Sequence, residues 1–257
     1  MDIERRQLLE RVAELYYLKR LTQQQIAIQT GYSRSMISRL ITEAHNSGVV
    51  EIQINFSHQR RLDLEHKLVE FLGIQKARVL AERSLDYQEI LNCLGEIAAQ
   101  LFKEFLIDNM TIGTSWGTGV YATVRAMHPG PYQGIKVIQT IGSLGTPNPQ
   151  IDGPELARQL ADKLLGQYFT LPVPLFVDSE STRDALYNTP HVRKILDSFN
   201  DISIALVGIG TVNPTKASLL RAGYLNVHQL DELRLAGAVG DVCAIHFDEK
   251  GQLVDTP

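Results

Sequence analysis

Hydrophobic residues recur at helical spacing near the start of the chain, and the residues between them carry helix start and stop signals. Between residues 5 and 19 the apolar positions that share one helix face are Leu8, Leu9, Val12, Leu15 and Tyr16. Thr22 and Gln25 match a capping box, which predicts a second helix from Gln23. Gly31 should end this helix, because glycine adopts positive φ at low cost.

A third helix is predicted from Arg34 to about His45, with Ser33 as its N-cap. Its apolar residues fall on one face, at Ile37, Leu40, Ile41 and Ala44. Its other face is polar and basic and holds Arg34, Ser35, Ser38, Arg39 and Thr42. A helix with two such faces packs on its own unit and presents the polar face outward.

The stretch from residue 49 to 54 is rich in β-branched residues, which predicts a strand, such as a wing beside the helices. Residues 56–61 are polar and basic, so we expect a first domain at 1–56 and a second at 61–257. The second domain opens on a helix with apolar residues at Leu64, Leu68, Phe71 and Leu72. Docking on its own domain is the favoured interpretation, and pairing with a copy of itself is the alternative.

Beyond residue 75 the pattern alternates between short apolar runs and longer amphipathic ones. Strands are predicted at about 77–81, 110–114, 135–141, 202–209 and 241–247, and helices at 87–107, 117–127, 153–165 and 228–235. Strands separated by helices favour a mainly parallel sheet with both faces covered. The fold class is therefore α/β, with a helical N-terminal domain.

Composition changes this picture little. The 257 residues are 44% hydrophobic and 21% charged, as in ordinary globular proteins. Residues 1–60 carry a net charge of +2 and the remainder −6, which is compatible with a small DNA-binding module on an acidic body. The two cysteines and seven histidines show no metal-ligand spacing, so no metal is expected. No apolar run is long enough for a membrane span, and we expect a cytoplasmic protein without membrane contact.

The first three helices predict a helix-turn-helix that binds DNA. Arginines on the outer face of the third helix can donate to guanine or phosphate, and short hydroxyl side chains allow close approach. The candidate DNA-binding residues are Gln23, Gln24, Ser33, Arg34, Ser35, Ser38 and Arg39. The alternative is a small three-helix bundle, or a protein-interaction module, whose serines and arginines are ordinary solvated residues.

Glycine-rich loops follow the predicted strands of the second domain, at the edge where open α/β folds bind ligands. Gly113, Thr114, Ser115, Gly117 and Thr118 join a strand to a helix N-terminus, which supplies N–H groups and a partial positive charge for a phosphate. Further candidates after other strands are Gly142, Ser143, Gly208, Gly210 and the hydroxyl acceptor Asp241. The alternative is that these loops are only tight turns.

Motifs along nearly the whole chain resemble the SorC family of sugar-responsive transcriptional regulators. In the first domain they are Leu15–Tyr17, Leu21–Ala27, Ser33–Leu40 and Gly48–Ile52. In the second domain they are Ile112–Thr118, Val137–Ser143, Ala205–Thr211 and Gly237–Cys243, continued by Phe247, Asp248 and Gly251. Their order along the chain is the order in the family.

The resemblance implies an effector domain similar to glucosamine-6-phosphate deaminase and ribose-phosphate isomerase. It also implies homo-oligomers, dimers or tetramers, whose operator binding responds to a sugar phosphate, with no cofactor. Family members usually continue past the block at Gly251 through a Gly-Gly-x-x-Lys segment whose lysine helps hold the effector. We expect that no residue here replaces that lysine and that the chain is shortened at its C-terminus. One member carries a Schiff-base lysine where Ile141 stands here, so no imine is expected.

Two enzyme classes compete with the regulator. Gly113-Thr114-Ser115-Trp116-Gly117 fits the nucleophile elbow of α/β-hydrolases, although no His-Gly-Gly oxyanion segment precedes it. A sugar-phosphate isomerase or deaminase would share the predicted fold and could use Asp241 as its base, although no second acid is evident. Neither enzyme accounts for the N-terminal helices, so the sequence favours a non-enzymatic regulator without catalytic residues.

Overall fold

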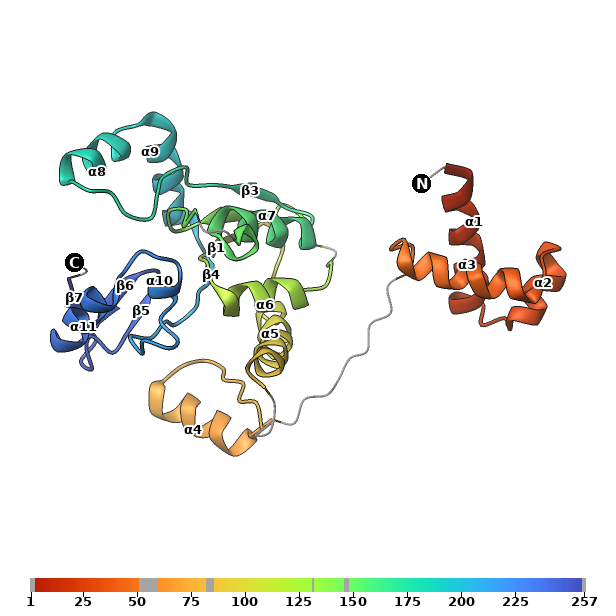
Figure 1. Cartoon of the computed structure of the whole chain (residues 1–257), viewed down its shortest axis with the longest axis horizontal. Helices are drawn as coiled ribbons and strands as arrows, with labels where there is room; N and C mark the ends of the chain where they lie inside the picture. Colours follow the sequence, from red (N-terminus) through yellow and green to blue (C-terminus); the bar gives the residue numbers. More distant parts are fainter. Residues whose placement is uncertain (1–2, 51–59, 82–85, 131, 146–147, 256–257) are drawn as a thin grey trace. The chain divides into compact units, whose positions relative to one another are not determined.

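The computed structural model describes residues 3–50, 60–81, 86–130, 132–145 and 148–255 (Figure 1). The chain divides into two compact units, Met1–Ser57 and His58–Pro257. We describe each unit by itself. Among the described residues, no helix combines the length and the apolar character that crossing a membrane requires.

The first unit is built from three helices around one small core. They are α1 (Ile3–Ala13), which continues into the π-helical turn η1 (Glu14–Leu18), α2 (Gln23–Thr30) and α3 (Arg34–Asn46). The predicted signals are confirmed. Thr22 and Gln25 form the capping box, and Gly31 ends α2 with φ +78°. The largest fully buried side chains are Leu9, Ile26, Ile37 and Leu40, one or two from each helix.

The predicted wing strand is not found where it can be checked. Val49 and Val50 lie outside any strand, and the Val50 N–H donates to the Ala44 carbonyl at 3.0 Å, which continues the end of α3. The rest of the predicted strand, residues 51–54, lies outside the described residues. A run of β-branched residues this short does not distinguish a strand from an extended segment that packs against the end of a helix.

A parallel four-stranded sheet forms the centre of the second unit. Its strands are β1 (Thr111–Thr114), β2 (Lys136–Gln139), β3 (Gln167–Phe169) and β4 (Ile204–Leu206), in the order β3-β2-β1-β4. The predicted strands at 110–114, 135–141 and 202–209 are thus confirmed, with shorter bounds. Sequence reasoning missed β3, whose Gln167 and Tyr168 are exposed and break the apolar pattern of a buried strand.

Helices cover both faces of this sheet, as the pattern predicted. Ile112 and Val137 face a core that includes α5 (Tyr87–Lys103), α6 (Thr118–Ala126) and α7 (Gly153–Lys163), with α5 packed on the outside of α6 (Figure 1). Ile138 points to the other face and packs with α9 (Pro190–Asp197). The remaining helices are α4 (Leu62–Leu72), α8 (Glu180–Tyr187), α10 (Ser218–Arg221) and α11 (Val227–Leu235), with short 3₁₀ turns η2 (Pro149–Ile151) and η3 (Ser198–Asp201).

Two strand predictions were wrong. The stretch 241–247 is not one strand of the parallel sheet: it folds into β5 (Gly240–Val242) and β6 (Ile245–Phe247), which with β7 (Leu253–Val254) make a separate antiparallel sheet. The turn falls at Cys243 and Ala244, which adopt φ +54° and +62°, and neither residue is a turn signal. Within the described part of the chain, residues 77–81 make only one bridge, between Leu80 and Arg60.

Candidate functional site

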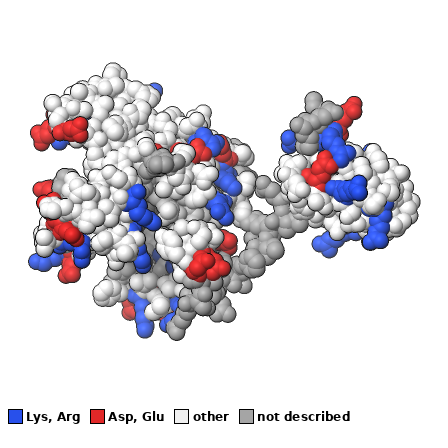
Figure 2. Space-filling model, viewed as in Figure 1, with Lys and Arg blue, Asp and Glu red and all other residues white. Residues whose placement is uncertain are grey.

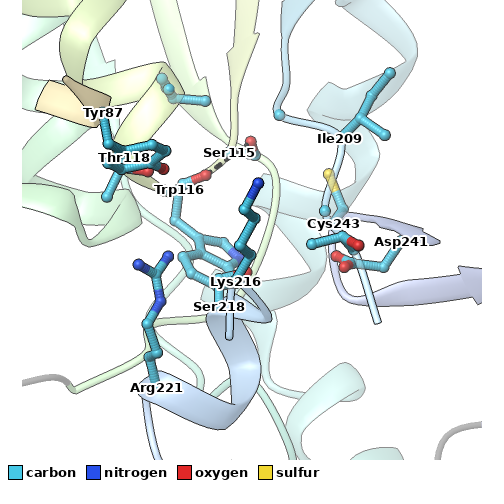
Figure 3. A pocket seen from close by; sticks show the side chains of 16 residues that line it. Tyr87, Ser115, Trp116, Thr118, Ile209, Lys216, Ser218, Arg221, Asp241 and Cys243 are labelled. Atoms are coloured by element: carbon cyan, nitrogen blue, oxygen red, sulfur yellow. Dashed lines mark hydrogen bonds between the residues drawn. The ribbon is translucent and has the colours of Figure 1, made fainter. Parts of the chain in front are cut away.

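A cavity of about 270 Å³ opens at the carboxyl ends of β1 and β4. The chain leaves β1 toward β2 on one side, while β4 lies on the other side of β1, so the loops that follow these two strands diverge. Such a switch point is where open α/β sheets bind ligands. The cavity is lined by Tyr87, by Ser115 to Val120, by Gly208 to Thr211, and by Lys216, Ser218, Arg221, Asp241 and Cys243 (Figure 3).

The loop after β1 brings a helix N-terminus to the cavity. Ser115 is 2% exposed, and its N–H donates to the Leu206 carbonyl of β4 at 3.1 Å, which ties the two diverging strands together. Gly117 has φ +115°, a conformation that favours glycine, and it precedes the first residue of α6, Thr118. The first N–H groups of α6 have no partner within their helix and carry its partial positive charge.

The opposite wall comes from the loop after β4 and the β5–β6 hairpin. The Gly210 N–H donates to the Asp241 carbonyl at 2.7 Å, and a Cβ at Gly210 would lie 1.9 Å from Asp241 Oδ1. The carboxylate therefore lies directly against glycine backbone. Asp241 is 6% exposed, and burial raises its pKa, although the neighbouring His246 acts in the opposite direction. Burial likewise raises the pKa of the Cys243 thiol.

Two cationic side chains line the same cavity, and sequence reasoning missed both. Lys216 and Arg221 extend from the α10 segment toward the loop after β1 (Figure 3). Two cations thus line this cavity, whereas sequence reasoning expected no residue to replace the family's C-terminal lysine. The four-residue helix α10 gives no periodic signal, and only the fold brings this segment beside α6.

The structure brings together six of the ten predicted effector residues: Ser115, Gly117, Thr118, Gly208, Gly210 and Asp241. The other four do not line the cavity. Gly113 and Thr114 are buried within β1, and a Cβ at Gly113 would lie 2.8 Å from Thr140 Cγ2.

Gly142 and Ser143 follow β2 instead of β1 or β4. A Cβ at Gly142 would lie 2.4 Å from the Pro174 carbonyl oxygen, and the Ser143 N–H donates to Val173 at 2.9 Å. This loop is therefore occupied by packing against the segment at 173–175. The fold thus brings the loops after β1 and β4 to the cavity, but not the loop after β2.

The outer face of α3 is exposed. Ser33, Arg34, Ser35, Ser38 and Arg39 are all solvent-accessible, while Ile37, Leu40, Ile41 and Ala44 are buried on the other side. Gln24 is exposed and Gln23 half-buried at the start of α2.

A groove joins these two helix starts. It is lined by Tyr16, Arg20, Leu21, Thr22, Gln23, Gln24 and Arg34, so Arg20 is a cation that the sequence prediction did not include. Figure 2 shows Lys and Arg side chains along the visible face of this unit, with acidic side chains confined to a smaller part.

Known proteins match both units. A family model described as "Putative sugar-binding domain" matches residues 57–257. The deoxyribonucleoside regulator of Bacillus subtilis is 31% identical over 253 residues, which cover 98% of this chain and 80% of that protein. The full-length sorbitol operon regulator SorC of Klebsiella pneumoniae has a crystal structure that matches with a TM-score of 0.73 at 28% identity, over 100% of this chain and 82% of that chain.

The chain belongs to the SorC family. The resemblance inferred from its motifs is thereby confirmed. The sorbitol operon regulator of Klebsiella pneumoniae supports the same assignment from sequence, at 30% identity over 97% of this chain and 79% of that protein.

Within this SorC-family chain, Ser115 of the Gly-x-Ser-x-Gly loop lines the cavity. Among the described residues that line the cavity, none is a histidine. The Ser115 hydroxyl donates to the Trp116 carbonyl at 3.5 Å, a long contact that does not activate a nucleophile. The Gly-x-Ser-x-Gly pattern is explained by geometry instead, because a tight strand-to-helix turn requires small residues.

Proposed function

We propose that this chain is a DNA-binding transcriptional regulator of sugar metabolism whose operator binding is modulated by a phosphorylated sugar. The first domain, residues 1–56, binds operator DNA through α2 and α3 as a helix-turn-helix. The second domain, residues 61–257, binds the effector. The proposal implies a cytoplasmic location, where operator DNA lies, and a homo-oligomer, since operators of such proteins are read by symmetric copies.

The exposed polar face of α3 supports DNA binding. Arg34 and Arg39 are exposed on this face. Ser35 and Ser38 lie between them, and their short side chains allow the helix to approach base edges. Gln23, Gln24 and Ser33 lie at helix starts, where side chains contact phosphates. Arg20, in the adjoining groove, adds a further phosphate contact.

The cations in the cavity are the observation that carries the effector proposal. Lys216 and Arg221 lie in one cavity with the N-terminus of α6, and these are three features that bind phosphate. Asp241, on the opposite wall, is an acceptor for sugar hydroxyls. A cavity of about 270 Å³ suits a small molecule. The domain fold that the family resemblance implies, similar to sugar-phosphate isomerases and deaminases, has the same ligand class.

A sugar-phosphate isomerase or deaminase is the second candidate, because Asp241 is a buried carboxyl in the cavity with a raised pKa, as general bases often are. We favour a regulator without catalytic activity, because the related proteins described above are regulators. Turnover separates the two: a ligand that binds but is not converted supports the regulator, and sustained product formation supports the enzyme.

A thermal-shift screen tests the effector proposal. Phosphorylated pentoses and hexoses are compared with the same sugars without phosphate and with inorganic phosphate alone. A ligand at a hundred times its dissociation constant stabilises the folded domain by about 2.7 kcal/mol, which gives a clear shift. We expect at least one phosphorylated sugar to raise the melting temperature and its unphosphorylated form not to. A screen in which no sugar phosphate shifts the transition contradicts the proposal.

A further inference from the structure

The cations of the first unit differ in whether a carboxylate neutralises them. Several form ion pairs with glutamates of the same unit, namely Arg5 with Glu43, Arg6 with Glu10 and Lys19 with Glu14. Arg20, in the turn before α2, and Arg34 and Arg39, on α3, are exposed, and none of these three forms an ion pair within the described part of the chain. Their charge is therefore available to an anion outside the unit.

Arg34 and Arg39 point in different directions from α3. Successive residues of an α-helix are rotated by about 100°, so these two side chains, which are five residues apart, are separated by about 140° around the helix. Arg34 lies close to two full turns before Ile41, which is buried, so it borders the packed face. Arg39 lies on the side turned away from the core, with the exposed Ser35 and Thr42 one turn before and after it.

The groove between the starts of α2 and α3 takes up Arg34 but not Arg39. Arg34 lines it together with Arg20, Tyr16 and Gln24, whereas Arg39 is not among its lining residues. Of the described residues that line this groove, none is a carboxylate, and its volume is about 760 Å³. Cations and hydrogen-bond donors without a neighbouring acid suit the phosphate backbone of DNA.

Arg20 occupies a backbone conformation that favours glycine. Its φ is +54°, which brings the Cβ of any other residue close to the following carbonyl oxygen. An arginine here lowers the stability of the fold relative to a glycine, and its side chain makes no ion pair in the described part of the unit that would offset the loss. Such strain points to a use of the side chain outside the fold.

We propose that these three arginines divide DNA recognition between them. Arg20 and Arg34 bind the phosphate backbone at the groove, and Arg39 reads base edges with Ser35 and Thr42 beside it. This division rests on the DNA-binding function proposed above and assigns roles within it. Arg34 is then a contact without sequence preference, although the sequence placed it on one outer face with Arg39. Thr42, which was not among the predicted DNA-binding residues, joins the residues that determine specificity.

Selection of duplexes from a random-sequence library tests this division without a known operator. The full chain and its variants Arg20→Gly, Arg34→Ala and Arg39→Ala each select DNA. Arg39→Ala should lose the wild-type preference at one base pair of the site, where discrimination falls by about fivefold to a hundredfold. Arg20→Gly and Arg34→Ala should select the wild-type sequence with lower affinity. Arg11→Ala, at an exposed arginine of α1 outside the groove, is the control and should match the wild type.

Salt dependence identifies the phosphate contacts. The slope of log affinity against log salt concentration falls by about one for each phosphate contact that is removed. Arg20→Gly and Arg34→Ala should each show this loss, and they should weaken binding of the selected duplex and of a scrambled duplex by the same factor. Arg39→Ala should instead weaken binding of the selected duplex more than that of the scrambled one. Arg34→Lys keeps a positive charge and should restore the slope.

The substitution at Arg20 also separates binding from folding. Glycine adopts φ +54° at low cost, so we expect Arg20→Gly to keep the wild-type melting temperature while its affinity for DNA falls. An unchanged salt slope in this variant overturns the division. So does an altered site selected by Arg34→Ala, or the wild-type site selected by Arg39→Ala. A wild-type chain that selects no DNA overturns the proposed function as well, whereas selection with these roles exchanged overturns this inference alone.

Discussion

The two units of this chain place their candidate binding residues in opposite ways. The first unit presents them on an open surface: Arg34 and Arg39 are exposed, and the buried face of α3 packs against the other helices. The second unit arranges them around a cavity, where Ser115 and Asp241 are almost fully buried and Lys216 and Arg221 are exposed. An exposed face suits a long polymer, and a cavity suits a small molecule. Because the candidate DNA-binding face and the candidate effector cavity lie in different units, a substitution can alter one of them and leave the other unchanged.

The largest expected effect is that of the Arg34→Ala/Arg39→Ala double variant, which tests the DNA-binding face of the first unit. Arg34→Ala and Arg39→Ala should each weaken operator binding by about 1–3 kcal/mol, because each removes a contact to a base or phosphate. Fluorescence anisotropy with DNA from the promoter region beside the gene measures this. Arg11→Ala, at an exposed arginine on α1, is the control. Sugar-phosphate binding should not change in any of the three. Operator binding that survives the double variant would contradict the assignment.

The second prediction tests the cavity of the second unit. Lys216→Ala and Arg221→Ala should each weaken binding of the phosphorylated sugar by about 1.5–3 kcal/mol, because each removes a charge-assisted hydrogen bond. Isothermal calorimetry measures the loss, with Lys250→Ala, at an exposed lysine away from the cavity, as the control. Operator binding without effector should stay at the wild-type value. Equal loss for an unphosphorylated analogue would mean that the two cations do not bind the phosphate.

A third prediction sharpens the account of the cavity wall. Gly210→Ala should destabilise the second unit by about 1–3 kcal/mol, because its Cβ would overlap the Asp241 carboxylate. Gly208→Ala in the same loop is the matched control, since its Cβ would meet no atom closer than 3.9 Å. Urea unfolding gives both values. Equal stability of the two variants would show that the Asp241 side chain moves away from the added Cβ at no cost in stability.

The smallest effect concerns Glu65 of α4, which is 4% exposed and accepts a hydrogen bond from Arg60 Nε at 2.7 Å. The pKa of Glu65 is lowered to about 2 from an ordinary 4.5, so its contribution to stability is present above pH 4.5 and is lost as the pH falls toward 2. Glu65→Gln should remove that part of the acid sensitivity, while Glu70→Gln, exposed on the same helix, should not. Chemical denaturation at a series of pH values tests this. If Glu65→Gln keeps the pH dependence of the wild type, the ion pair between Glu65 and Arg60 is not the cause of this acid sensitivity.

Local signals explain why the first unit could be predicted from the sequence. The capping box at Thr22, the stop at Gly31 and the cap at Ser33 each act within four residues, and the structure has all three. The parallel strands β1, β2 and β4 were also predictable, because buried strands are continuous apolar runs.

The cavity is formed by residues that are far apart in the sequence, so no local sequence pattern predicts which of them meet. Lys216 and Arg221 reach it because the fold brings α10 to the same cavity as the start of α6. Gly142 does not line the cavity and packs against Pro174 instead. The sequence therefore predicted the loops after β1 and β4 but neither cation. The β5–β6 turn was missed because Cys243 and Ala244 adopt a conformation that their residue types disfavour.

The most direct test of the central claim measures both units in one titration. Operator DNA is titrated with the wild-type chain and with the Lys216→Ala/Arg221→Ala double variant, each with and without the sugar phosphate found in the thermal-shift screen. The account predicts that the sugar phosphate changes operator affinity of the wild type and leaves that of the double variant unchanged. A sugar phosphate that binds in the cavity without changing operator affinity of the wild type would contradict it.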